Sequence, residues 1–170
     1  DTYVYASSAD FVDNTNNVVV DSINDADGTD RVLISGSISI DATDSLVRAE
    51  GIDAIEAAAD TADRDHSIII SSDANLNDVR TIDLDGSSNV GSTGVVNLTG
   101  VTQATTIMGV SAGNNTLTGG SAADSITGGS ASDTITGAGG ADTLAGGEGN
   151  DTYVYASSAD FVDNTNNVVV

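Results

Sequence analysis

The chain has 170 residues and a formal net charge of −22, with 26 acidic residues against 4 basic ones. This excess of negative charge argues against binding to nucleic acid or to anionic membrane surfaces. The absence of cysteine excludes disulfides and thiolate metal sites. Only 39% of residues are hydrophobic and no apolar stretch is long enough for a membrane span, so we expect a thin core and no membrane insertion.

Residues 1–20 are identical to residues 151–170 at all twenty positions, which gives a repeat period of 150 residues. We therefore expect a longer tandem array, in which residues 1–20 end one repeat and residues 151–170 begin the next. The alternative is a piece that happens to hold one repeat and part of another. Four tyrosines lie in these copies, and we expect them to cap a core, with a sugar-stacking patch as the alternative: Tyr3, Tyr5, Tyr153 and Tyr155.

Residues 21–40 hold a divergent unit, in which Gly28 and Asp30 precede Val32, followed by alternating apolar residues that predict β-strands: Val32, Ile34, Ile38 and Ile40. The three aspartates of the string DADGTD, residues 25–30, are further candidate calcium ligands, although a solvated turn explains them equally well: Asp25, Asp27 and Asp30.

Residues 44–59 are the best helix candidate, because Asp44 can cap the first turn and apolar residues recur at helical spacing. Gly51 weakens this prediction, and a helical turn followed by a strand is the alternative. His66 has no second histidine or cysteine to complete a metal site, so we interpret it as a surface loop residue.

Short β segments bounded by Gly, Ser and Asn follow at residues 79–86, 94–101 and 104–110. Their spacing predicts an irregular solenoid. Residues 21–109 are therefore expected to be an irregular β-solenoid or β-rich segment, either continuous with residues 110–163 or a separate subdomain.

Residues 119–154 contain four nine-residue units of the form G-G-x-G-x-D-x-U-x, in which U is a large apolar residue. The sixth positions hold Asp124, Asp133, Asp142 and Asp151. A glycine-rich turn of six residues and a strand of three make half a coil, so two units complete one coil of eighteen residues. Asp124 then lies over Asp142, and Asp133 over Asp151, about 5 Å apart.

Like charges at that spacing require a cation. Calcium suits such a place because it accepts six to eight oxygen ligands with flexible geometry, including backbone carbonyls.

These units resemble the calcium-binding nonapeptides of the repeats-in-toxin (RTX) family, which form parallel β-rolls. The resemblance implies metal sites at the four aspartates and at glycines of the turns, namely Gly119, Gly128, Gly137, Gly140, Gly146 and Gly149. Two fourth-position glycines are replaced, by Ala122 and Ala131.

Degenerate units flank the four regular ones and extend the expected β-roll to residues 110–163. The upstream unit carries Asn115 in place of aspartate, and the downstream unit keeps Asp160. Asp1 and Asp10, the copies of Asp151 and Asp160, are further candidate ligands.

The expected fold is mainly all-β, a right-handed parallel β-roll or β-solenoid with Ca²⁺ in the turns. The sequence carries no catalytic motif, so we expect no enzyme. We expect a secreted structural repeat of a bacterial surface layer, biofilm-matrix fibre or adhesin stalk, which folds on calcium outside the cell. The resemblance implies export by type I secretion.

The expected partners are neighbouring copies, head to tail and laterally, and cell-surface polysaccharide. Two alternatives stay open: a solenoid that binds ice or polysaccharide, and a secretion and folding module of a larger RTX enzyme or toxin.

Overall fold

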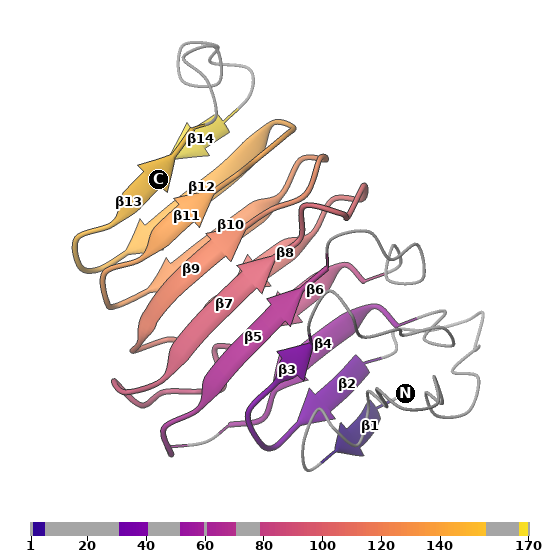
Figure 1. The fold of residues 1–170 in the computed structure, drawn as a ribbon, viewed down its shortest axis with the longest axis vertical. Helices are drawn as coiled ribbons and strands as arrows, with labels where there is room; N and C mark the ends of the chain where they lie inside the picture. Colours follow the sequence, from indigo (N-terminus) through magenta and orange to yellow (C-terminus); the bar gives the residue numbers. More distant parts are fainter. Residues whose placement is uncertain are drawn as a thin grey trace.

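The computed structural model describes residues 2–5, 31–40, 52–59, 61–70, 79–155 and 167–169, and every regular element among them is a β-strand. The strands form two parallel sheets, which we call sheet A and sheet B (Figure 1). In spatial order, sheet A contains β1 (Thr2–Tyr5), β2 (Arg31–Ile34), β4 (Ala54–Ala57), β6 (Thr81–Asp83), β8 (Thr106–Met108), β10 (Ser125–Gly129), β12 (Asp142–Gly147) and β14 (Asn167–Val169). Sheet B contains β13 (Thr152–Val154), β11 (Thr134–Thr136), β9 (Asn114–Thr118), β7 (Thr93–Asn97), β5 (Asp65–Ile69) and β3 (Ser39–Ile40).

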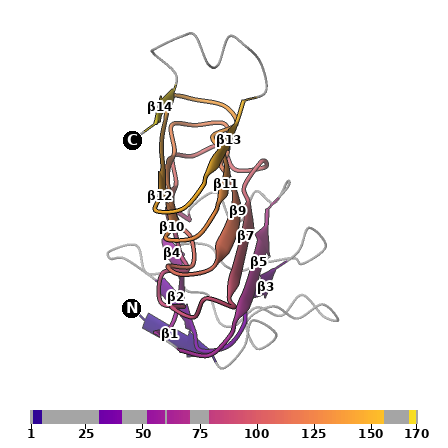
Figure 2. The same ribbon diagram turned by 90° about the vertical axis from the view of Figure 1, so that its left-hand side faces the viewer.

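From β2 to β14 the chain alternates between the two sheets, so each coil contributes one strand to each sheet. Figure 2 shows the sheets facing each other along the length of the molecule. This is a parallel β-solenoid, which confirms the expected fold class. None of the described residues belongs to a helix that could cross a membrane.

Coil length divides the solenoid into two regions. Between β9 and β13 the register advances by one nonapeptide pair per coil, as in the pairing of Thr134 with Thr152. Further upstream the coils are longer, and Asp65 pairs with Thr93 across 28 positions. The sheets continue without a break across this change, because the extra residues lie between the strands.

The centre of the core contains one inward column from each sheet, stacked coil upon coil, and further buried aliphatic side chains pack around these columns. The column of sheet A contains Val32, Ile55, Ile82, Ile107, Ile126 and Leu144. The column of sheet B contains Ile40, Ile68, Val96, Leu117 and Ile135, with the partly buried Tyr153 at its end. Each fully buried aliphatic side chain contributes roughly 1.5–3 kcal/mol of transfer free energy.

Two sequence predictions differ from the structure. The described part of the expected helix, residues 52–59, contains the strand Ala54–Ala57 and no helix, because Ile55 lies in register between Val32 and Ile82 and completes the core column. The rest of that prediction, residues 44–51, lies outside the described residues. His66 is not a surface loop residue: it belongs to β5 and is 1% exposed.

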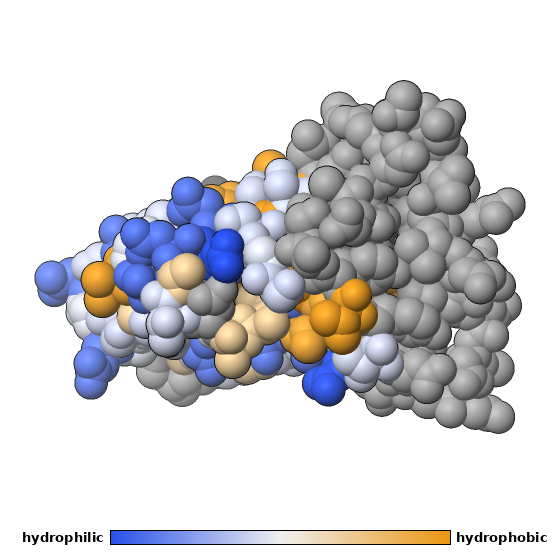
Figure 3. Space-filling view, turned by 90° about the horizontal axis from the view of Figure 1, so that it is seen from below, coloured by the Kyte–Doolittle hydropathy of each residue, from blue (hydrophilic) through white to orange (hydrophobic). Residues whose placement is uncertain are grey.

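On the face that Figure 3 shows, hydrophilic and apolar areas of the described residues lie side by side. The exposed large hydrophobic side chains among the described residues are Val4, Val90, Val95 and Val154. Val4 and Val154 are equivalent positions of the two sequence copies. The hydroxyl of Tyr153 accepts a hydrogen bond from the Gly146 N–H at 2.7 Å, so this tyrosine caps the core as expected.

Candidate metal centre

Polar side chains form two columns where the chain turns into the strands. The corner column of sheet A contains Thr105, Asp124 and Asp142, each at or just before the start of its strand. The corner column of sheet B contains Asn115, Asp133 and Asp151. Five of these six side chains are buried, and Asp151 is partly buried.

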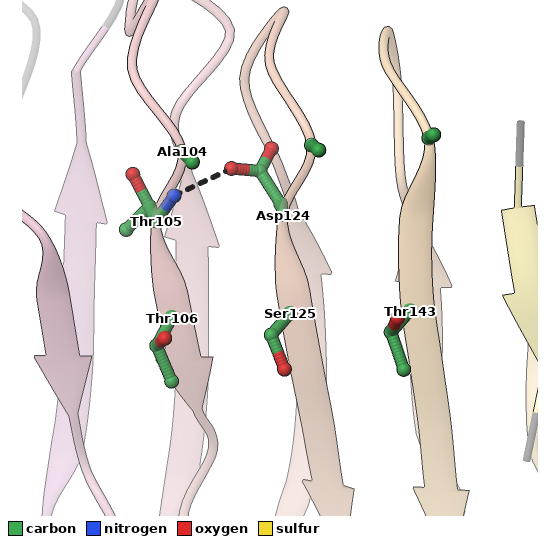
Figure 4. Close-up of a pocket in the computed structure, with 8 residues that line it drawn as sticks. Ala104, Thr105, Thr106, Asp124, Ser125 and Thr143 are labelled. Atoms are coloured by element: carbon green, nitrogen blue, oxygen red, sulfur yellow. Dashed lines mark hydrogen bonds between the residues drawn. The ribbon is translucent and has the colours of Figure 1, made fainter.

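One carboxylate oxygen of each of the four corner aspartates accepts a hydrogen bond from the preceding coil. The Asp124 N–H donates to Asp142 Oδ1 at 2.9 Å, and the Asp133 N–H donates to Asp151 Oδ1 at 3.0 Å, both across 18 residues. Thr105 makes the same bond to Asp124 Oδ1 at 2.8 Å (Figure 4). The aspartates therefore link consecutive coils by hydrogen bonds, in addition to being candidate ligands.

The second carboxylate oxygen, Oδ2, is less well satisfied. Asp124 Oδ2 accepts the Gly120 N–H at 2.7 Å. The Oδ2 atoms of Asp133 and Asp142 are buried and accept no hydrogen bond from the protein, although both residues are held through Oδ1. A buried carboxylate oxygen without a donor costs free energy, and a bound cation would remove that cost.

The first glycine of each unit makes room for this oxygen. A Cβ at Gly128 would collide with Asp133 Oδ2 and with the carbonyl oxygen of Gly146 in the next coil. Gly119 lies in the same way against Asp124 Oδ2 and the Gly137 carbonyl oxygen. The glycines thus let carboxylate and carbonyl oxygens approach one another.

The fourth-position glycines set the shape of the later turns. Gly140 and Gly149 have φ values of 111° and 100°, which side chains rarely adopt. Their replacements in the earlier units, Ala122 and Ala131, do not have positive φ, so those turns follow a different backbone path. Ala138, at a second position, does have a positive φ of 69°.

The contacts of Asn115 show that oxygen atoms surround a donor group at this corner. Its Nδ2 donates to four oxygens: those of Val110 and Gly113 at 3.1 Å, Gly128 at 3.4 Å, and Asp133 Oδ1 at 2.9 Å. Three carbonyls and one carboxylate therefore converge on a single electropositive group. The same set of oxygens suits Ca²⁺.

Burial raises the pKa of Asp124 and Asp133. It raises the pKa of Asp142 to about 6, to which the neighbouring charge of Asp124 also contributes. The protein alone therefore disfavours the ionised form of these side chains. A divalent cation would reverse that preference.

The described residues contain no group of three or more His, Cys, Asp or Glu that could hold a metal. An ion here would depend on pairs of carboxylates together with main-chain carbonyls, which is an oxygen set that calcium accepts. The residues present fit calcium, with the four described aspartates and the glycine carbonyls of the turns as its candidate ligands. Six other candidates lie outside the described residues: Asp1, Asp10, Asp25, Asp27, Asp30 and Asp160.

The structure adds members to these columns that the sequence did not indicate. Thr105 ends the aspartate run of sheet A. In sheet B the register continues upstream from Asn115 through Gly94 and His66 to Ile38. Consecutive members of this upstream column lie as far apart as the 28 residues between Ile38 and His66, a spacing that no nine-residue pattern can reveal.

A family model of the RTX calcium-binding nonapeptide repeat (four copies) matches residues 110–144, 118–153 and 127–162. No curated protein and no solved structure shows significant similarity to the chain. Residues 110–162 are therefore RTX nonapeptide repeats, as the sequence predicted. Repeats of this type bind calcium and are typical of secreted proteins exported by type I secretion.

Proposed function

We propose that this chain is a structural repeat of a bacterial cell-surface array, matrix fibre or adhesin stalk, which becomes rigid when it binds calcium outside the cell. One observation carries the proposal. The segment that recurs after 150 residues contributes a strand to the solenoid in both of its copies, as β1 and as β13. A solenoid whose repeat boundary is itself a strand can continue from one repeat into the next.

Calcium would control the stiffness of such a rod. Without the ion, two carboxylates at the corners of the RTX coils, those of Asp133 and Asp142, bury a second oxygen that accepts no hydrogen bond. Extracellular sites typically have dissociation constants of about 0.1–1 mM, so millimolar calcium would add roughly 0.4–1.4 kcal/mol per ion. Several ions per repeat would favour folding outside the cell and an extended chain during export.

We also propose that the chain has no catalytic activity of its own. The buried polar side chains of the corner columns are occupied with the backbone of neighbouring coils, and the acidic residues shape turns. The proposed partners are further copies of the repeat, head to tail and side by side. Cell-surface polysaccharide is a further proposed partner.

Regular hydroxyl rows favour a second candidate, a solenoid that binds ice or polysaccharide. On sheet B, Thr116, Thr134 and Thr152 lie in register on successive coils. On sheet A, Thr106, Ser125 and Thr143 do the same and line a shallow depression of about 250 Å³ (Figure 4). Thermal hysteresis or binding to a glycan array by one repeat would support this candidate.

Calcium titration of a two-repeat protein tests the first proposal. We expect the β signal in circular dichroism and the sedimentation coefficient to rise cooperatively between EGTA and 10 mM calcium. Asp142→Ala should weaken the transition, whereas Ser125→Ala, an exposed change on the neighbouring strand, should leave it unchanged. A chain that is fully folded in EGTA would contradict the calcium-dependent role.

A further inference from the structure

The two copies of the sequence TYVY lie in different sheets. The first copy is β1, which pairs with β2 in sheet A, with Tyr3 opposite Val32. The second copy is β13, which pairs with β11 in sheet B, with Tyr153 opposite Ile135. Identical sequences would be expected to occupy equivalent places in a simple repeating rod, so this difference needs a structural reason.

The two pairings use opposite edges of the same strand. β13 contacts the coil that precedes it in the chain, whereas β1 contacts the coil that comes after it. A strand inside a parallel sheet pairs on both edges at once. The two observations are therefore two halves of one arrangement, in which TYVY joins the last coil of one repeat to the first coil of the next.

We propose that, in the tandem protein, the next copy of β2 pairs with β13 in sheet B, so that successive repeats exchange sheets. β2 itself belongs to sheet A. Each strand of a repeat then lies in the opposite sheet from its counterpart in the neighbouring repeats. Successive repeats are related by a half-turn about the solenoid axis. This inference rests on the proposed tandem array.

Spacing excludes the simpler arrangement without a half-turn. In that arrangement the next copy of β2 would pair with β14 in sheet A. Positions 17 and 31 correspond to the starts of β14 and β2. They lie closer together than the 18 residues of the tightest coil in the described structure, which separates Asp124 from Asp142. The intervening segment is therefore too short to cross to sheet B and return.

The half-turn arrangement satisfies the spacing on both sheets. β1 reaches β2 across 29 positions, from Thr2 to Arg31. The free edge of β14 would then receive the next copy of β3, because positions 17 and 39 are separated by more than the 18 residues of the tightest coil. Longer coils of 28 residues, as between Ile38 and His66, already occur upstream, so both connections resemble observed ones.

The half-turn gives the rod two chemically equivalent sides. Each side shows sheet A of one repeat followed by sheet B of the next. The outward hydroxyl row of Thr106, Ser125 and Thr143 therefore alternates along one side with the row of Thr116, Thr134 and Thr152. Such a rod can associate laterally on both sides through the same contacts.

Disulfide trapping in a two-repeat protein tests the arrangement, because the native chain has no cysteine. The first variant combines Val154→Cys with Leu33→Cys in the second repeat, since Val4, the copy of Val154, pairs with Leu33. Adjacent strands lie about 4.8 Å apart, within the range that a disulfide spans. The second variant combines Val168→Cys with the same Leu33→Cys and reports the arrangement without a half-turn.

Both variants are oxidised in 10 mM calcium and in EGTA, and the bond is read from intact mass and gel mobility with and without reductant. We expect at least a tenfold excess of the disulfide in the first variant over the second. Preferential bonding of Val168→Cys overturns the half-turn but leaves the array. Folding without either bond also overturns it, because the repeats are then separate solenoids.

The two proposals fail in different ways. A protein that forms the first disulfide equally well in EGTA supports the half-turn and contradicts the calcium-dependent function. A two-repeat chain that remains unfolded at 10 mM calcium overturns both.

Discussion

In both the upstream coils and the RTX coils, a side chain at the corner of sheet B binds a backbone N–H of the preceding coil. In the RTX coils, the N–H of one coil donates to the aspartate of the next, as Asn115 does to Asp133 Oδ1 at 2.7 Å. Upstream, the Ile38 N–H donates to His66 Nδ1 at 3.1 Å in the same register. A side-chain acceptor therefore links consecutive coils in both regions.

The two solutions differ in the charge that remains. Because His66 Nδ1 accepts a hydrogen bond, the neutral ring carries its proton on Nε2, which lies 2.7 Å from Ser87 Oγ. Both ring nitrogens are thus satisfied without a charge. Asp133 satisfies one oxygen and buries the other without a donor. All polar atoms of the His66 ring therefore have partners within the protein, whereas the second oxygen of Asp133 would gain a partner only from a bound cation.

The upstream coils also bury more aliphatic side chains than the RTX coils. The coil from Thr81 to Thr105 buries five large aliphatic side chains: Ile82, Leu84, Val96, Leu98 and Val101. The coil from Ser125 to Asp142 buries only Ile126 and Ile135. We infer that apolar burial stabilises the upstream coils and that ion binding must replace part of it in the RTX coils.

Removal of calcium should cause the largest loss of stability, and it should affect the RTX coils but not the upstream coils. In EGTA we expect backbone amides of residues 110–155 to lose most of their protection from hydrogen exchange, while those of residues 79–98 keep it. The physical reason is that the fully buried carboxylates of the described residues, those of Asp124, Asp133 and Asp142, all lie at the RTX corners. Hydrogen exchange read by mass spectrometry on peptides of each region would measure this. Equal loss in both regions would show that the solenoid unfolds as one unit.

His66→Ala should destabilise the upstream coils by about 2–4 kcal/mol, because it leaves the buried Ile38 N–H without an acceptor and opens a cavity. The loss should be the same with and without calcium. Chemical denaturation at both calcium levels would measure it. His66→Asn is the matched control, since Asn115 fills the same column and an amide oxygen can accept the bond. A calcium-dependent loss would contradict the separation of the two regions.

The sequence predicted the RTX coils well because a fixed nine-residue period reports the register directly. Asp124 and Asp142 lie one above the other for that reason. His66 was misinterpreted because its column neighbour Ile38 lies 28 residues away and is chemically unlike it. Where loops vary in length, register is set by strand pairing, which a single sequence does not display.

The helix prediction failed for a related reason. Residues 54–57 have the composition of a helix, but Ile55 completes a core column between two strands that are distant in sequence. Tertiary packing overrides local propensity in such a case. Thr105 was missed because its contribution is a backbone N–H, which any residue type except proline supplies.

The effect of Asp133→Asn on stability should depend on whether calcium is present. With calcium it should lower stability by about 1–3 kcal/mol, because a charged ligand is lost. In EGTA it should leave stability unchanged or raise it, because the amide keeps the acceptor for Asn115 and removes a buried charge. Asn115, in the same column, shows that an amide fits such a corner, because its Nδ2 donates to the Gly128 carbonyl oxygen of the next coil. Thermal unfolding at both calcium levels would measure the change. A loss of equal size in both conditions would assign Asp133 a purely structural role.

Acidification in EGTA should shift the hydrogen-exchange protection of the two regions in opposite directions. Burial raises the pKa of Asp142 to about 6, above its ordinary value. The folded RTX coils therefore bind protons more tightly than the unfolded chain, and they gain stability as the pH falls from 7 towards 4. Burial lowers the pKa of His66, with the charge of Arg64 adding to the effect. The upstream coils therefore lose stability as the pH falls below about 6.5, where the unfolded histidine takes up its proton.

Hydrogen exchange at pH 7 and pH 5, corrected for intrinsic rates, would resolve the two trends. Asp142→Asn should flatten the trend of the RTX coils, and His66→Asn should flatten that of the upstream coils. Calcium should invert the RTX trend, because protons then compete with the ion for the same oxygens. A common trend in both regions would mean that the corner columns do not control their response to pH.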